Sequence, residues 1–562
     1  MPFRGQNLTP AAPLLDAHPP PAQKGLPLSI LSVQPTAHAF ADLEPFPPTP
    51  SPAGEPPPRG SPALQFSIAF ESSGKWPDDL TAIAALKAAF YLRLANLLEE
   101  QAKVTCEVHA GCLYAQIDSF TFVGVIQHDA TAHLLEKAGD ASAAMKLQWQ
   151  TALGAKHVSA LTALGRAKPA YPPAVRLAKR WLACQMQSGV LTDALVALLV
   201  AHGFTSTVAD RAPASAAAGF VRFLQLLVTS DFENEPVLVV LGDTPMTTAQ
   251  QETAAAAFAA ARATAANAST GITGLSGPSP DPEIAAVGQR ALPTIWVATD
   301  EQPNGADGVA PGPPWNLVAR LRAVAASALG QMDRAMNLDF GVVVALSTAP
   351  GGTTAAGQSA DEETRATAPK DAAEAAAMAT DRGLQALVGH VFDPPLADFD
   401  ALLNLVPAKL SKAHLSWVPT TEDGGAGRGG EVKKYGKSAQ SAFANLRHGA
   451  IGSGVGQDDV ATLVSQLRSV YGSLALFFYD GEGGRTIAIK WRPAAFLPAP
   501  LRSAEAQHRT LVPRTDAKTD DDSGGSEVWA LPNIPDVLAG IVQLGGGLIK
   551  GVRLIPSSHG LA

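Results

Sequence analysis

The first clear pattern in the chain is a strict alternation of apolar and polar residues over residues 64–70. A period of two indicates a half-buried strand. Pro77, Asp78 and Asp79 then suit the first turn of a helix, where proline fits and negative charge meets the positive end of the helix dipole. Apolar residues follow three or four apart, which predicts a helix with one buried face. They are Leu80, Ile83, Leu86, Phe90, Leu94 and Leu97.

Further elements follow as far as residue 298. Residues 155–235 have apolar positions at helical spacing, and the short apolar runs around them indicate strands. Thr192 is a good N-cap for one of the helices. The predicted elements are strands at 104–109 and 113–126 (bent at Gly124), helices at 175–186, from 192 and at 216–229, and strands at 236–240 and 294–298.

The C-terminal part contains a strong hairpin signal. Two apolar strands, residues 474–479 and 486–491, flank the Asp-Gly turn at Asp480, and such turns are typical of hairpins. The other elements predicted here are helices at 317–329, 460–471 and 535–544 and a strand at 340–347.

Composition narrows the classes of protein that the chain can belong to. It has 562 residues, which predicts several domains. Its net charge is -9, whereas a protein that binds nucleic acid mainly through phosphates has a basic surplus. The three cysteines form neither a disulfide framework nor a zinc pattern, and no apolar run has the length of a membrane span.

Four stretches, in the same order, resemble blocks of the nucleolar RNA-associated protein (Nrap) family. The resemblance extends over roughly residues 25–555 of the chain. The stretches are residues 70–80 with 87–90, residues 171–181 with 198–201, residues 219–227, and residues 471–480 with 489–493.

The resemblance implies an α/β (α+β) fold with tandem domains. A nucleotidyltransferase-like mixed-sheet domain, inactive, would span residues 25–155 after a disordered leader at 1–24, with a Pro-rich insert near 41–62. A helical poly(A)-polymerase/oligoadenylate-synthetase-like domain would span residues 156–305. A C-terminal Nrap-type α/β domain would span residues 306–555, with disordered inserts near 351–369 and 420–440.

The sequence offers little for catalysis. A nucleotidyltransferase needs a Gly-Ser turn for the triphosphate and two carboxylates, two residues apart on one strand, to hold two metal ions. Residues 29–40 contain neither. Asp398 and Asp400 have the right spacing and would share one face of a strand, but Gly389-His390 stands where Gly-Ser is needed. An acidic pair after a Pro-Pro turn is more typical of turn and cap chemistry. We expect no catalytic residue, no metal and no cofactor.

Two clusters of basic residues are candidates for RNA contact. Three cations lie three and four apart on the predicted helix at 175–186, so they share one face that can meet phosphates or ribose. The alternative is an ordinary solvated helix face with paired carboxylates. Two more cations flank Trp491, which we expect to pack rather than stack on a base. The candidate RNA-binding residues are Arg176, Lys179, Arg180, Lys490 and Arg492.

The resemblance implies a non-catalytic, RNA-associated scaffold in the nucleolus. Its role would be small-subunit (18S) rRNA processing and ribosome biogenesis within the small-subunit processome. The implied partners are pre-rRNA, small nucleolar RNA and processome proteins of a UTP-C type subcomplex, with no membrane and no small-molecule substrate. Two alternatives remain: an active nucleotidyltransferase that uses Asp398 and Asp400, and a pure protein-interaction module.

Overall fold

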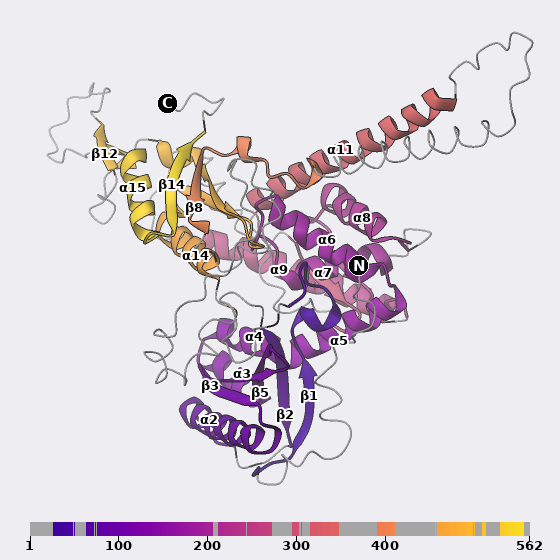
Figure 1. The fold of residues 1–562 in the computed structure, drawn as a ribbon, viewed down its shortest axis with the longest axis vertical. Coiled ribbons are helices and arrows are strands. Elements are labelled where there is room, and N and C mark those ends of the chain that lie inside the picture. Colours follow the sequence, from indigo (N-terminus) through magenta and orange to yellow (C-terminus); the bar gives the residue numbers. More distant parts are fainter. Residues whose placement is uncertain are drawn as a thin grey trace, which may run out of the picture.

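The chain forms three groups of elements in the structure, which is a computed structural model (Figure 1). The predicted leader and the predicted inserts near 351–369 and 420–440 lie outside the described residues. The structure describes residues 26–48, 50, 63–71, 74, 76–205, 212–242, 244–271, 295–302, 305, 315–347, 390–407, 410, 456, 458–497, 499–500, 509–512 and 529–555.

The first group is built on a five-stranded sheet in the order β1-β2-β5-β4-β3. β2 and β5 pair in parallel, and the other neighbours pair antiparallel. The strand predicted at residues 64–70 is confirmed with the same bounds. The strands are β1 (Ile30–Pro35), β2 (Leu64–Phe70), β3 (Thr105–His109), β4 (Cys112–Ile117) and β5 (Phe120–Gln127).

Helix α2 (Leu80–Leu97) packs its apolar stripe against this sheet. The predicted N-terminal cap is confirmed, since the Asp79 carboxylate accepts a hydrogen bond from the Ala82 amide at 2.8 Å. The hydroxyl of Tyr91 accepts one from the Ile126 amide of β5 at 2.7 Å. By length and composition alone, the helical stretch to Ala102 could also cross a membrane. Its contacts with the sheet are those of a core helix.

The single strand predicted at 113–126 is wrong, because the chain turns in the middle of it. β4 and β5 form a hairpin around Asp118 and Ser119, whose φ angles are 48° and 70°. No glycine marks this turn, so its signal is absent from the sequence. Gly124 is not a bend but a position inside β5, where a Cβ atom would lie 2.9 Å from the ring of Phe66.

Three helices connect the sheet to the rest of the molecule: α3 (Asp129–Lys137), α4 (Ala141–Gln150) and α5 (Ala152–Ala167). α5 packs against the short 3-10 helix η2 (His38–Ala41). Ala41 and Leu43 are buried in the core of the following helical group. The Pro-rich insert predicted near 41–62 therefore begins later than expected, since residues 41–43 contribute to a core.

The second group is helical, as predicted. The helix predicted at 216–229 is α8 (Ala216–Thr229), and Thr192 caps α7 (Asp193–Thr205) through the Leu195 amide at 3.2 Å. The other elements are α6 (Tyr171–Cys184), α9 (Thr248–Gly271) and the parallel strands β6 (Val237–Val239) and β7 (Val297–Thr299).

Two predictions are wrong in the region of helix α11 (Trp315–Ser347). The strand predicted at 340–347 is its C-terminal part, because an apolar run of this length does not distinguish strand from helix. The predicted domain boundary at 305/306 also separates elements that belong together. α11 lies beside α8 (Figure 1), and its residues Val318, Leu321 and Ala325 belong to the same core as α8.

The third group is a four-stranded antiparallel sheet in the order β14-β8-β10-β9. The predicted hairpin is confirmed as β9 (Ala475–Tyr479) and β10 (Thr486–Trp491). Helices α14 (Asp459–Tyr471) and α15 (Ile534–Leu544) pack on the sheet and confirm the predictions at 460–471 and 535–544.

Five strands of this part have no counterpart among the predicted elements. Four of the five have two to five residues, and their partners lie at least 17 residues away in the sequence, so the local pattern carries little signal. They are β8 (Ala401–Leu405), β14 (Ile549–Leu554) and the small sheet of β11 (Ala499–Pro500), β12 (Arg509–Val512) and β13 (Trp529–Pro532).

Candidate nucleic-acid interface

Helix α6 carries three of the candidate RNA-binding residues. Pro172 and Pro173 lie in its first turn, where a missing amide hydrogen costs nothing, and its apolar stripe includes the fully buried Trp181. The stripe fixes the rotation of the helix, and this rotation decides where its cations point. They contact acidic residues from three other parts of the chain: the connector at residues 38–44, the start of α7 and the β9–β10 turn.

Arg176 is the most exposed of the three cations on α6. Its side chain is 36% exposed and donates to the carboxylate of Asp42, 72% exposed, at 2.8 Å. A pair this open to water contributes about 0–1 kcal/mol. Arg176 can therefore exchange Asp42 for another anion at little cost.

Lys179, by contrast, is buried, with 5% of its side chain exposed. Its ammonium lies 3.2 Å from a Glu44 carboxylate oxygen, 3.5 Å from one of Asp193 and 3.3 Å from Nδ1 of His38. Those three partners could together hold a metal ion, since their ligand atoms lie within 4.8 Å of one another. The ammonium of Lys179 lies within 3.5 Å of all three groups, so its positive charge occupies the position that a metal ion would take. The connector at residues 38–44 covers Lys179, so its side chain does not lie on a solvated face, and its proposed contact with RNA stays a prediction.

Two histidines line the same buried region. The rings of His38 and His157 lie 5.3 Å apart. Burial, and then the positive charge of Lys179, lower the pKa of His157 to about 4. The same two causes lower the pKa of His38 well below its usual value. Both imidazoles are therefore neutral near pH 7, and Nδ1 of His38 can accept a hydrogen bond from Lys179.

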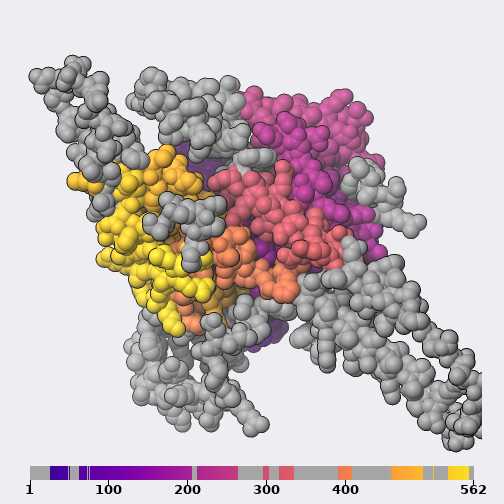
Figure 2. Space-filling view, turned by 90° about the horizontal axis from the view of Figure 1, so that it is seen from above, coloured from indigo at the N-terminus to yellow at the C-terminus, as the bar shows by residue number. Residues whose placement is uncertain are grey.

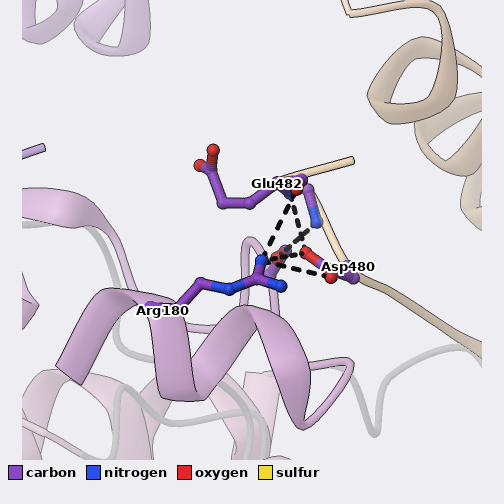
Figure 3. A network of polar contacts seen from close by, with 5 residues as sticks. Arg180, Asp480 and Glu482 are labelled. Atoms are coloured by element: carbon purple, nitrogen blue, oxygen red, sulfur yellow. Dashed lines mark hydrogen bonds and ion pairs between the residues drawn. The ribbon is translucent and has the colours of Figure 1, made fainter. Parts of the chain in front are cut away.

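Arg180 joins the helical group to the C-terminal group. Its guanidinium lies 3.3 Å from the Asp480 carboxylate, with both side chains 12% exposed, and reaches the carbonyl of Glu482 at 3.5 Å (Figure 3). The Asp480 carboxylate also accepts from the Glu482 amide at 2.8 Å. The hairpin turn predicted from its Asp-Gly signal is thus also a docking point for α6.

Backbone contacts reinforce this junction. The Tyr479 amide donates to the Met186 carbonyl at 3.1 Å, and its carbonyl accepts from the Ser188 amide at 3.3 Å. The Ser188 hydroxyl accepts from the Gly481 amide at 2.8 Å. β9 is the last strand in its sheet, so the segment after α6 covers part of an edge that would otherwise present unpaired backbone groups.

The second basic candidate site also makes intrachain contacts. Lys490 donates to one carboxylate oxygen of Asp400 at 2.9 Å, and the Trp491 amide donates to the other at 2.8 Å. Arg492 donates through Nε to the Gly472 carbonyl at 2.8 Å. Trp491 is buried and packs edge-on against Phe496, which confirms its expected packing role.

Asp398 and Asp400 do not share one face of a strand, so that prediction is wrong. Asp398 ends a 3-10 helix (Leu396–Asp398), whereas β8 begins at Ala401. Asp398 lies 3.7 Å from Arg320, while Asp400 bonds to β10. The alternative interpretation as turn and cap chemistry is the one that these contacts support.

Sequence reasoning found the cations but missed their partners. Nothing in the spacing of α6 points to Asp42 and Glu44, which are more than 130 residues away. The available signal was indirect: Glu44 follows the buried Leu43, and Asp193 follows Thr192, the N-cap of α7.

A mixed sheet covered by helices and followed by a helical group is an architecture of the nucleotidyltransferase class. Family models assign the chain more closely. Residues 22–164 match the Nrap protein nucleotidyltransferase domain 4, residues 168–277 the Nrap protein PAP/OAS1-like domain 5, and residues 396–552 the Nrap protein domain 6. These matches cover more than half of the chain, which therefore belongs to the Nrap family.

Curated relatives agree with this assignment. Nucleolar protein 6 of Mus musculus and of Homo sapiens are each 25% identical to 94% of this chain. Nucleolar protein 6 of Drosophila melanogaster is 33% identical over 225 residues, which are 38% of this chain and 19% of that protein. The chain spans 40% of the length of the mouse and human relatives.

Proposed function

We propose that this chain is a non-catalytic, RNA-associated scaffold of small-subunit (18S) rRNA processing in the nucleolus. Membership of the Nrap family and relatives named nucleolar protein 6 support a nucleolar role in ribosome biogenesis. The proposed partners are pre-rRNA, small nucleolar RNA and small-subunit processome proteins of a UTP-C type subcomplex. In this proposal the nucleotidyltransferase-like unit at residues 25–155 has a structural role and does not catalyse a reaction.

The observation that carries the non-catalytic part of the proposal is the bonding of the acidic pair. Both carboxylate oxygens of Asp400 accept hydrogen bonds, from Lys490 and from the Trp491 amide. Asp398 lies beside the guanidinium of Arg320. Two-metal catalysis needs carboxylates that converge on the same ions, and these two are bonded to different elements.

The RNA-associated part of the proposal depends on cations that can leave their present partners. Arg176 is the best candidate, because its pair with Asp42 is exposed at both ends. Lys490 is about one-third exposed and could add a second contact near Arg492. Lys179 and Arg180 would act indirectly, by holding α6 in place against its neighbours.

The test is a pair of opposite substitutions at one exposed ion pair. Arg176→Gln removes the positive charge, whereas Asp42→Asn removes the anionic partner and leaves Arg176 free to bind RNA. Neither substitution changes a core residue. We expect Arg176→Gln to weaken binding of a fluorescent pre-18S RNA fragment severalfold and to lower the salt slope by about 1. Asp42→Asn should strengthen binding. Equal affinities of both variants and the wild type for the RNA fragment would mean that this face of α6 does not contact RNA.

Catalysis is tested in parallel by nucleotide incorporation into an RNA primer with Mg²⁺. We expect no incorporation above a protein-free control. Incorporation that disappears in an Asp398→Asn/Asp400→Asn variant would establish the nucleotidyltransferase alternative.

A pure protein-interaction module is the second candidate function. The net charge of -9 and the intrachain pairing of the candidate cations favour it. It predicts no affinity for the pre-18S fragment above that for an unrelated RNA at physiological salt.

A further inference from the structure

A cavity of about 650 Å³ lies between α11 and the segment at residues 390–398. Figure 2 shows the surfaces of these two segments, coral and orange, side by side. One face of α11 lines the cavity with Arg320, Ala323, Val324 and Gln331. The size is that of a ligand-binding cavity, and the location is outside the candidate nucleic-acid interface described above.

Arg320 is held in an unusual position at one end of this cavity. Its guanidinium lies over the rings of Phe399 and Phe478, 4.5 Å and 5.1 Å from their centroids. Its side chain is 19% exposed, and Asp398 at 3.7 Å is too distant for a hydrogen bond. Nε and Nη2 are buried and have no hydrogen-bond acceptor among the residues that the structure describes.

Unsatisfied buried donors are costly, about 1–3 kcal/mol each and more for charged groups. Burial lowers the pKa of Arg320, and the charge of Asp398 offsets only part of this effect. A ligand or an ordered water is one way in which such a group obtains its missing partner. A ligand at this end of the cavity would therefore need an oxygen that accepts hydrogen bonds from Arg320.

Gln331 presents the complementary group further along α11. Its side-chain oxygen is buried and has no donor within the described part of the chain. Gln331 lies about three helical turns from Arg320, or about 16 Å along the helix axis. An extended peptide rises about 3.3 Å per residue, so about five residues would bridge the two groups. A backbone offers both the carbonyl that Arg320 lacks and the amide that Gln331 lacks.

The remaining walls also favour a peptide over a nucleic acid. Ala323 and Val324 line one side, and Pro394 and Pro395 line the other. Two arginines and two aspartates line the cavity, so its formal charge is balanced and attracts no polyanion. None of its lining residues is Phe, Tyr or Trp, the side chains on which unpaired bases usually stack.

We propose that this cavity binds an extended, apolar-rich peptide segment of a partner protein. One carbonyl of the peptide accepts from Arg320 and one amide, about five residues away, donates to Gln331. Apolar side chains of the peptide pack between α11 and the two prolines. The proposal concerns a different surface from the RNA contact, so either can fail without the other.

The test uses short random peptides displayed on phage, selected on the full chain. Selected peptides are then synthesised with a fluorophore and titrated against matched variants. Ala323→Trp fills the cavity, whereas Ala326→Trp places the same ring at an exposed position of α11 that does not line it. We expect binding to weaken at least about tenfold in Ala323→Trp and to be unchanged in Ala326→Trp.

Gln331→Leu supplies an independent variant if Ala323→Trp lowers stability. It removes the acceptor at similar volume and should weaken the same peptides severalfold. The proposal is overturned if no selected peptide binds tighter than about 100 µM, or if the selected peptides bind all variants equally. Displacement of a bound peptide by a single-stranded RNA oligonucleotide would instead assign the cavity to RNA.

Discussion

Lys179 shows at the scale of a single residue how a predicted surface cation becomes an internal one. Its spacing with Arg176 and Arg180 on α6 was visible in the sequence, and so was the helix itself. Glu44 and Asp193, which surround its ammonium, come from two other segments and cannot be inferred from helical spacing. The residue types were predictable, but their surroundings depend on which chain segment covers the helix.

Lys179→Met should lower the free energy of unfolding by about 2 kcal/mol. Removing one partner of a buried pair costs about 3–5 kcal/mol, and the exposure of Asp193 reduces this figure. Urea denaturation measures the change. Arg176→Met is the matched control on the same helix and should cost less than about 1 kcal/mol. Equal effects of the two substitutions would contradict the buried role of Lys179.

The buried histidines predict a specific pH dependence. The pKa of His157 falls from 6.5 to about 4 on folding, so below pH 6.5 the unfolded chain binds a proton that the folded chain does not. Its contribution to stability is therefore complete above pH 6.5 and is lost as the pH falls towards 4. In that window His157→Leu should have a slope of stability against pH about 1.4 kcal/mol per unit smaller than the wild type. Parallel curves for the two proteins, from denaturation at each pH, would be inconsistent with a neutral buried His157.

At the scale of elements, the sequence predicts those whose signal is local. The helix at 216–229 and the hairpin at 474–491 needed only apolar spacing, a cap or a turn residue. The hairpin between β4 and β5 was missed because Asp118 and Ser119 adopt positive φ without glycine. The C-terminal part of α11 was assigned as a strand because its apolar run fits both elements.

Replacing Asp118-Ser119 with Asn-Gly should stabilise the protein by about 0.5–1 kcal/mol. Both residues have positive φ, which glycine adopts without strain and asparagine tolerates well. The change is measured by the midpoint of thermal unfolding. Thr131→Gly in the first turn of α3 is the control and should destabilise by about 1 kcal/mol, because it lowers helix propensity and removes the hydrogen bond between the Thr131 hydroxyl and His128. A loss of stability in the Asn-Gly variant would mean that the turn depends on side-chain contacts.

At the scale of the whole molecule, the helical and C-terminal groups meet through α6 and the β9–β10 turn. Arg180 and Asp480 are 300 residues apart in the sequence and form a largely buried pair. The family resemblance predicted the order of the domains but not how they are joined. The junction combines this ion pair with backbone bonds of Met186, Ser188 and Tyr479 and with an apolar cluster that includes Met186, Phe399 and Phe478.

Double-mutant cycles should give a larger coupling energy for the Arg180–Asp480 pair than for the exposed Arg176–Asp42 pair. With Arg180→Met and Asp480→Asn we expect a coupling energy above about 1.5 kcal/mol, because both side chains are shielded from water. The cycle of Arg176→Met and Asp42→Asn should give less than about 1 kcal/mol. Coupling that is no larger at Arg180–Asp480 would argue against a fixed arrangement of the two groups.

The proposed function of the chain is that of a scaffold in small-subunit assembly. The most direct measurement is purification of the tagged chain from nuclear extract, with pre-18S RNA quantified against mature 18S RNA and the bound proteins identified by mass spectrometry. We expect enrichment of pre-18S RNA and small-subunit assembly proteins with the tagged chain. A folded chain that enriches neither the RNA nor these proteins would contradict it.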